Sequence, residues 1–316
     1  MSLIAARPHT QTITKMQACL PESLTKITPW RSFVALAMDW ALIGASFAAY
    51  IYFPRPVVGV IAAILIARTQ LALAVLMHEG AHGVLANNRS VNNFVGQAFT
   101  AAPLMLSMFA YRQGHIQHHR APMTSDDPVA VIFGIGDYPV PKKELVWRLF
   151  KDLTSISYFL SMRDLLKGKH RKLMTKDKGT SKSKTTVFVL ASIFVTNGIL
   201  LGALAALGHP GLYFALWILP ALTFLQVFAR MRAITEHAGF PPCDDQTKNA
   251  RSIVRPNWQT FLFGPHRIHY HIEHHQYVHA PFYHLQQIHN VMKLQGALPS
   301  DNLYRSYVRV LKDVTL

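Results

Sequence analysis

The sequence is poor in acidic residues and in cysteine. Its 316 residues hold only 16 aspartates and glutamates against 32 lysines and arginines, and 15% of the chain is charged, whereas soluble domains average about a quarter. With 50% hydrophobic residues, this composition excludes a disordered chain and favours a membrane protein. Two cysteines, Cys19 and Cys243, are too few for a disulfide scaffold or for the thiolate ligands of an iron–sulfur cluster.

Long apolar stretches divide the chain, and the positive charge flanks them. Four stretches approach or reach the roughly 20 helical residues that cross a bilayer, and they are residues 33–53, 57–77, 187–207 and 211–229. Because the net charge of +16 lies mostly outside these stretches, it does not indicate a nucleic-acid partner. The positive-inside rule places both termini and residues 111–185, which hold 15 basic against 7 acidic residues, in the cytoplasm.

Short connections pair these stretches. Pro54 and Pro56 lie between the first two and Pro210 between the last two, which favours two tight helical hairpins. Residues 94–110 are too short and too polar for a comfortable span, so we predict a re-entrant or interfacial segment there. Residues 167–185 predict a loop that is either solvated or in contact with anionic head groups. The first 32 residues show no cleavable signal.

The expected fold class is an all-α integral membrane protein that forms one domain over residues 1–316. Four transmembrane helices form two hairpins, and residues 111–185 and 230–316 form a cytosolic helical cap.

Histidines are numerous, and eight of the 17 fall into three boxes. The boxes are His78-Glu-Gly-Ala-His82, His115-Ile-Gln-His118-His119 and His271-Ile-Glu-His274-His275. Residues three and four apart share one face of a helix, so each box can aim its imidazoles at a common point. His237, just after the fourth apolar stretch, is a ninth candidate. Nine histidines are too many for one zinc site and favour two redox metals with open positions, most simply iron.

The boxes resemble those of the membrane fatty-acid desaturase and hydroxylase superfamily, whose pattern is H-x(3–4)-H followed by two H-x-x-H-H boxes. Tyr111-Arg112 before the second box, Asp126-Asp127-Pro128 after it and Glu236-His237 before the third extend the likeness. The resemblance implies two non-haem irons in the cytosolic cap, with O₂ as co-substrate and electrons from an external ferredoxin, rubredoxin or cytochrome b5 type donor. The implied iron ligands are His78, His82, His115, His118, His119, His237, His271, His274 and His275.

Two positions depart from this pattern. Many desaturases have asparagine where this chain has His269, and acyl-CoA desaturases have asparagine where it has Ala233. The resemblance therefore favours a lipid-linked acyl chain or another hydrophobic substrate over an acyl-CoA. His269 either supplies the missing metal contact or is an ordinary surface histidine.

Acidic residues beside the boxes are candidates to orient the ligand rings, because a metal-bound histidine usually donates its second N–H to a carboxylate or carbonyl. The candidates are Glu79, Asp126, Asp127, Glu236 and Glu273, each of which is otherwise a solvated or ion-paired acid. No catalytic residue is predicted beyond the metal ligands.

The predicted function is O₂-dependent desaturation of a fatty-acyl lipid chain. Hydroxylation or ketolation of a lipid or carotenoid on the same scaffold is the alternative. His78-Glu79-x-x-His82 also matches the zinc metalloprotease motif, but that interpretation leaves the other two boxes unexplained.

Two charged residues lie inside the first two apolar stretches. Arg68 precedes His78 by 10 residues, or about 15 Å of helix, and Asp39 lies at a similar depth on the neighbouring antiparallel helix. Because unpaired charges are costly inside a membrane, we predict that Asp39 and Arg68 contact each other.

Overall fold

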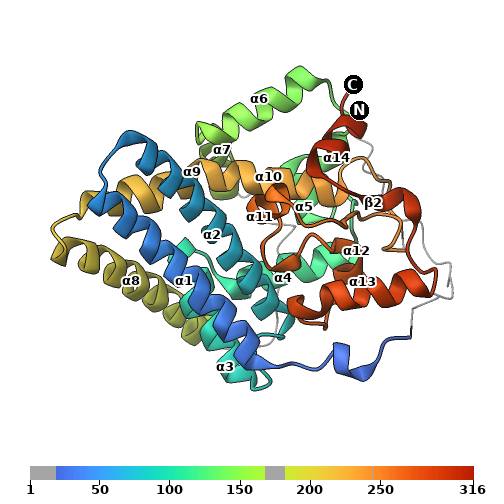
Figure 1. Ribbon diagram of the computed structural model, residues 1–316, viewed down its shortest axis with the longest axis horizontal. Coiled ribbons are helices and arrows are strands. Elements are labelled where there is room, and N and C mark those ends of the chain that lie inside the picture. The colour runs from blue at the N-terminus through green and yellow to red at the C-terminus, as the bar shows by residue number, and fades with distance from the viewer. Residues whose placement is uncertain (1–18, 168–181, 244) are drawn as a thin grey trace.

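The computed structural model describes residues 19–167, 182–243 and 245–316, in which helices are the main regular structure (Figure 1). The first half contains η1 (Glu22–Leu24), α1 (Pro29–Tyr52), α2 (Pro56–His82), α3 (Arg89–Val95), η2 (Gly96–Ala101), η3 (Ala102–Leu104), α4 (Met108–Arg120), α5 (Pro128–Phe133), η4 (Ile135–Asp137), α6 (Lys142–Leu153) and α7 (Ile156–Leu166). The second half contains α8 (Lys182–Ala206), η6 (Tyr213–Ile218), α9 (Leu219–Leu222), α10 (Phe224–His237), α11 (Trp258–Phe263), η7 (Pro265–Arg267), α12 (His271–Gln276), η8 (Phe282–His284), α13 (Leu285–Leu294), η9 (Ser300–Asn302) and α14 (Tyr307–Asp313). Two short strands, β1 (Ser252–Ile253) and β2 (Leu303–Tyr304), pair in parallel.

Within the described residues, four helical runs are long and apolar enough to span a bilayer, which confirms the predicted all-α membrane fold with four spans. They are α1, α2, α8 and the run Tyr213–His237, which comprises η6, α9 and α10. The N-terminus, which was predicted to be cytoplasmic, and most of the loop predicted at 167–185 lie outside the described residues. The second and fourth runs extend past their apolar stretches, so His82 and His237 are the last residues of α2 and α10.

A sharply bent segment lies between the two hairpins. Arg89–Leu104 and Met108–Arg120 meet at 95°. Backbone carbonyls at such a bend need partners inside the protein, because membrane lipid offers none. Side chains from three spanning runs supply them, since Trp40, Asn197 and Trp217 donate hydrogen bonds to carbonyls of η2 and η3. The surrounding spans therefore fix the bend.

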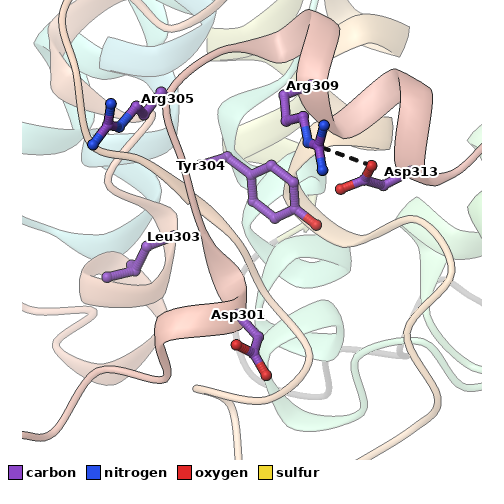
Figure 2. Close-up of a pocket in the computed structure, with 6 residues that line it drawn as sticks. All are labelled: Asp301, Leu303, Tyr304, Arg305, Arg309 and Asp313. Atoms are coloured by element: carbon purple, nitrogen blue, oxygen red, sulfur yellow. Dashed lines mark ion pairs between the residues drawn. The ribbon is translucent and has the colours of Figure 1, made fainter.

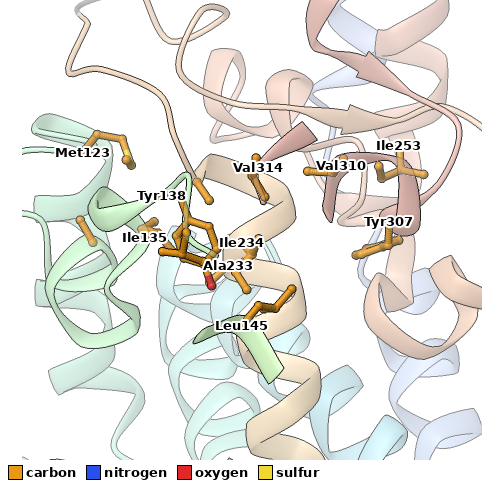
Figure 3. Packing of buried hydrophobic residues seen from close by; sticks show 13 residues of the cluster. Met123, Ile135, Tyr138, Leu145, Ala233, Ile234, Ile253, Tyr307, Val310 and Val314 are labelled. Carbon is orange, nitrogen blue, oxygen red and sulfur yellow. The ribbon is translucent and has the colours of Figure 1, made fainter. Parts of the chain in front are cut away.

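A buried cluster holds the end of α10 in place (Figure 3). Ile234 of α10 is fully buried and belongs to one apolar cluster with Ile135, Tyr138 and Val310. These residues come from η4, the loop after it, and α14, so segments far apart in sequence pack around one turn of helix. Because burying a side chain of this size contributes about 1.5–3 kcal/mol, the cluster fixes the position of His237 three residues later.

The predicted contact between Asp39 and Arg68 is confirmed, with Nη1 of Arg68 lying 3.4 Å from Oδ1 of Asp39. The structure adds a third member, because Nε2 of His266 lies 2.7 Å from Oδ2 of Asp39. Nε of Arg68 also donates to the Phe261 carbonyl. The cluster therefore ties α1 and α2 to the segment that leads into the third box, and it satisfies both oxygens of a carboxylate inside the membrane domain.

We expect Asp39 and Arg68 to be energetically coupled. Asp39→Ala or Arg68→Ala alone should lower the free energy of unfolding by about 3 kcal/mol, because each leaves its partner buried and incompletely paired. The double variant should cost less than the sum of the two, with a coupling energy of at least about 1 kcal/mol. Detergent-denaturant unfolding of the four proteins measures this, and strictly additive losses would contradict the pairing.

Candidate metal centre

Nine histidines gather in two groups where α2, α4, α10 and α12 converge. The first group is His78, His82, His115, His119 and His274, and the second is His118, His237, His271 and His275. Within each group, the potential ligand atoms lie within 4.8 Å of one another. Seven of the nine side chains are buried and the other two are half-buried. All nine histidines that the sequence singled out thus come together in space.

The second and third boxes are divided between the groups. His115 and His119 of α4 belong to the first group, whereas His118 belongs to the second. On α12, His274 joins the first group and His271 the second. Positions i+3 and i+4 differ by about 100° around a helix, so one short helix can serve two sites. The expectation that each box aims at one common point therefore holds only for the first box.

Close backbone contacts position the first two boxes. Arg112 donates from Nε and Nη2 to the carbonyls of Ala81 and Gly80, at 2.9 Å each. A Cβ added at Gly80 would lie 2.8 Å from Sδ of Met108 and 3.3 Å from Cα of Gly96. The end of α2 is thereby held against α4, and this gives a structural reason for the arginine that precedes the second box.

The histidine rings face one another through their Nε2 atoms at 2.8–3.1 Å. In the first group the contacts join His78 to His274, His274 to His119, His119 to His115 and His115 to His82, and in the second they join His271 to His237 and His275. A neutral imidazole carries one proton on its two nitrogens. Each Nε2 that does not carry this proton offers a lone pair to the neighbouring nitrogens, and a cation bound between them would be stabilised by these lone pairs.

Hydrogen bonds on the opposite side of two rings set which nitrogen carries the proton. Nδ1 of His237 lies 2.8 Å from the Asn249 carbonyl, and Nδ1 of His118 lies 2.8 Å from Oδ1 of Asp127. Both partners only accept hydrogen bonds, so both Nδ1 atoms donate. In the neutral form of each ring, Nε2 is then the unprotonated nitrogen, as a metal ligand requires.

Burial keeps the rings uncharged. Burial, reinforced by the neighbouring histidines, lowers the pKa of His115, His271 and His274 well below the ordinary value. For Asp127, burial alone would raise the pKa, but the adjacent His118 and the Met123 N–H outweigh it and lower the pKa. The site therefore combines neutral nitrogen donors with an ionised carboxylate behind one of them.

Two further acids lie beside ligand rings without forming hydrogen bonds to them. An oxygen of Glu79 is 3.3 Å from Nδ1 of His78, and an oxygen of Glu236 is 3.4 Å from Nδ1 of His271. The second oxygen of Glu79 accepts the Phe282 N–H at 2.9 Å. A glutamate bound in this way, beside a group of five histidines, does not match the free general base of a zinc protease.

The remaining two candidate acids contact none of the nine histidines in the described part of the chain. Asp126 is exposed. Glu273 is buried and binds His289 and Ser252. The structure thus assigns the carboxylate behind His118 to Asp127 and not to its neighbour Asp126. The sequence alone did not distinguish the two.

His269 and Ala233 are both packed in the protein interior. Nδ1 of His269 donates to the Ile253 carbonyl at 2.7 Å, and burial lowers its pKa to about 4. It belongs to neither histidine group and is not a surface residue, so neither sequence-based expectation for it holds. Ala233 lies in the apolar cluster around α10.

Sequence analysis missed two residues that hold ligand rings. The Asn249 carbonyl orients His237, and Oε1 of Gln246 lies 3.1 Å from Nδ1 of His275. Gln246 also donates to the His119 carbonyl, so it contacts residues of both groups. A backbone carbonyl has no sequence signature, and an isolated glutamine in a loop carries no metal-binding pattern.

The spacing of the ring nitrogens fits metals with nitrogen-rich shells. With metal–nitrogen bonds of about 2.1 Å, adjacent ligand atoms lie about 3.0 Å apart in an octahedron and about 3.4 Å apart in a tetrahedron. The observed 2.8–3.1 Å matches the octahedral spacing. Five and four histidines would leave positions open in such shells. The donor set therefore fits two metal ions that bind further ligands.

A separate surface hollow of about 500 Å³ lies between β2 and α14 (Figure 2). Its lining includes Tyr304, Arg305 and the ion pair between Arg309 and Asp313. None of the nine histidines lines it, so it is distinct from the metal centre.

The structure thus combines four candidate membrane spans with two buried histidine groups that could hold metal ions, and comparison with known proteins assigns the family. The chain belongs to the Fatty acid desaturase family, which it matches over residues 54–308. It is similar to dihydrorhizobitoxine desaturase of Bradyrhizobium elkanii, with 30% identity over 236 residues. The matched region covers 71% of this chain and 64% of that relative, so the chain spans less than two thirds of the relative's length.

Asp127 and Asp126 provide a matched test of the carboxylate behind His118. Asp127→Asn can keep the oxygen that caps α5 at the Val129 N–H, but it removes the charge behind His118 and the acceptor of the Met123 N–H, so it should lower metal affinity or activity by about 10–100-fold. Asp126→Asn should change neither, because that side chain is exposed. Metal content per chain and product formation measure both effects. Equal losses in the two variants would contradict the assignment.

The metal-free protein should lose stability in acid. In the unfolded chain the histidines have a pKa of about 6.5, whereas burial lowers the pKa of His115 and His271. Below about pH 6.5 the unfolded state therefore binds more protons than the folded state, and the free energy of unfolding falls as the pH falls. Unfolding of chelator-treated protein at about pH 8 and pH 5.5 measures this. Equal stability at both values would contradict neutral buried rings.

Proposed function

We propose that this protein is a di-iron desaturase that removes two hydrogens from a fatty-acyl lipid chain in an O₂-dependent reaction. The observation that supports this proposal most is the convergence of nine histidines into two adjacent groups at the end of the membrane spans. Membership of the Fatty acid desaturase family supports the same reaction class.

The first group would hold one iron and the second group the other. When bound, two redox-active irons would supply the dioxygen and electron-transfer chemistry that an unactivated C–H bond requires and that acid–base residues cannot provide. The overall reaction balances as one alkyl –CH₂–CH₂– unit, O₂, two electrons and two protons giving –CH=CH– and two waters.

The protein's own residues fix the ligands and keep bulk water out. Asp127, Asn249 and Gln246 hold three rings from behind, which sets their orientation before any metal binds. Seven of the nine rings are buried, which limits the access of bulk water to the site. Exclusion of water would suppress side reactions during turnover. Glu79 and Glu236, beside His78 and His271, would accept ring N–H groups after small side-chain movements.

A substrate that partitions into the membrane is consistent with the position of the site. The spans α2 and α10 end in His82 and His237, so the metal centre lies where the membrane-spanning helices terminate. The similarity to dihydrorhizobitoxine desaturase favours desaturation over hydroxylation or ketolation. It also makes dihydrorhizobitoxine-like compounds a second candidate substrate class.

We further propose that the metal centre faces the cytoplasm and takes electrons from an external donor of the ferredoxin, rubredoxin or cytochrome b5 type. The excess of basic over acidic residues in residues 111–185 supports this orientation through the positive-inside rule. The same charge would attract an acidic soluble donor.

Expression in a host that lacks its own desaturase should produce new unsaturated acyl chains when a compatible electron donor is present. We expect His115→Ala to abolish the product, because it removes a nitrogen that contacts both His82 and His119. His209→Ala should retain activity, since His209 lies in the exposed turn after α8. Mass spectrometry of the lipids, with iron analysis of the purified proteins, measures the outcome.

Other products would indicate a different reaction or a different substrate class. A lipid that gains one oxygen indicates hydroxylation, and a lipid that gains one oxygen while losing two hydrogens indicates ketolation. Turnover of dihydrorhizobitoxine with no change in host lipids would assign the second substrate class. Zinc at full occupancy with no oxygen consumption would overturn the di-iron proposal itself.

A further inference from the structure

Two neighbouring helices of the cap, α6 and α7, expose large apolar side chains. Trp147, Phe150 and Leu153 of α6 and Phe159, Leu160 and Leu166 of α7 are 40–82% exposed. We call these six residues the α6–α7 apolar face. Contiguous apolar surface of this kind on a soluble protein marks a contact with a partner or a membrane.

Contacts with α10 place this face near the edge of the membrane domain. Asp152, at the end of α6, forms a buried ion pair with Arg230 of α10. Arg230 precedes His237 by seven residues, or about 10 Å of helix, and directly follows the fourth apolar stretch of the sequence. Leu145, near the start of α6, packs in the cluster that contains Ile234. Helix α6 therefore slopes from the metal-centre end of α10 towards the membrane.

The composition of the two helices is typical of a membrane–water interface. Trp147 stacks on Phe150 with ring centroids 5.5 Å apart, and the ammonium of Lys151 lies 5.7 Å from the Trp147 ring. Lys142 and Lys143 are exposed at the start of α6, and Arg163 is exposed on α7. Tryptophan and basic side chains of this kind anchor helices at the level of lipid head groups.

We propose that α6 and α7 lie in the bilayer interface, on the leaflet that faces the metal centre, with the α6–α7 apolar face in contact with acyl chains. The bilayer that surrounds the candidate spans can itself cover the α6–α7 apolar face, so no protein partner is needed to bury it. The basic residues at the ends of the helices complement anionic head groups. Part of the segment predicted as a cytosolic cap is thus embedded in the membrane surface.

Fluorescence quenching at single cysteines tests this proposal. Both native cysteines are free, so Cys19→Ser and Cys243→Ser give a cysteine-free background. Phe150→Cys and Phe159→Cys would each carry an environment-sensitive dye on the full-length protein, reconstituted in phosphatidylcholine–phosphatidylglycerol vesicles. Lipids with a spin label near the head of the acyl chain should quench both dyes at least about twofold more than aqueous iodide does.

Two matched positions calibrate the measurement. Both native side chains are exposed on the protein surface. Phe194→Cys on the spanning helix α8 is the reference for a lipid-exposed position, and Val308→Cys on α14, outside the spans, is the reference for a water-exposed position. Iodide quenching at 150 and 159 equal to that at 308 would overturn the proposal, since the face would then lie in water. Protection from both quenchers would also overturn it, and would indicate a protein partner or a second copy of the chain. The readout needs no enzymatic turnover, so it is independent of the proposed reaction.

Discussion

The packing of neutral imidazoles with their Nε2 atoms 2.8–3.1 Å apart is the constraint on which the rest of the site depends. Without a cation, facing Nε2 atoms that both lack a proton repel each other through their lone pairs, and a second proton on any ring would add charge repulsion in a buried place. The fold holds this arrangement from outside, through Asp127, the Asn249 carbonyl and the arginine contacts between α2 and α4. Much of the packing around α10 and α4 thus serves to keep a cation site open.

The division of the second and third boxes links the two histidine groups mechanically. Because α4 and α12 each contribute to both groups, neither helix can shift without moving ligands of both sites. The separation of the two histidine groups is then set by the geometry of two short helices. Gln246, which contacts His119 and His275 from the loop after α10, reinforces this link across the two groups.

The sequence predicted the features that depend on local patterns. Apolar runs predicted the four spans, helical spacing predicted the histidine boxes, and equal depth predicted the pairing of Asp39 with Arg68. It did not predict His266 as a partner of Asp39 or the Asn249 carbonyl as a partner of His237, because these contacts join segments through tertiary packing. The sequence also did not predict the α6–α7 apolar face. The reason here is that the many basic residues of that region dominate its average composition.

The ends of the spans constrain how a membrane substrate reaches the metal centre. Along α10, His237 lies about 10 Å beyond Arg230, and along α2, His78 lies about 15 Å beyond Arg68. Arg230 directly follows the fourth apolar stretch, whereas Arg68, which is paired with Asp39, lies inside the second, so the histidine groups lie at the ends of the spans. For the acyl substrate proposed above, the chain would have to reach this end of the spans to place a C–H bond beside the histidine groups, and its polar end would then lie on the side of the cap.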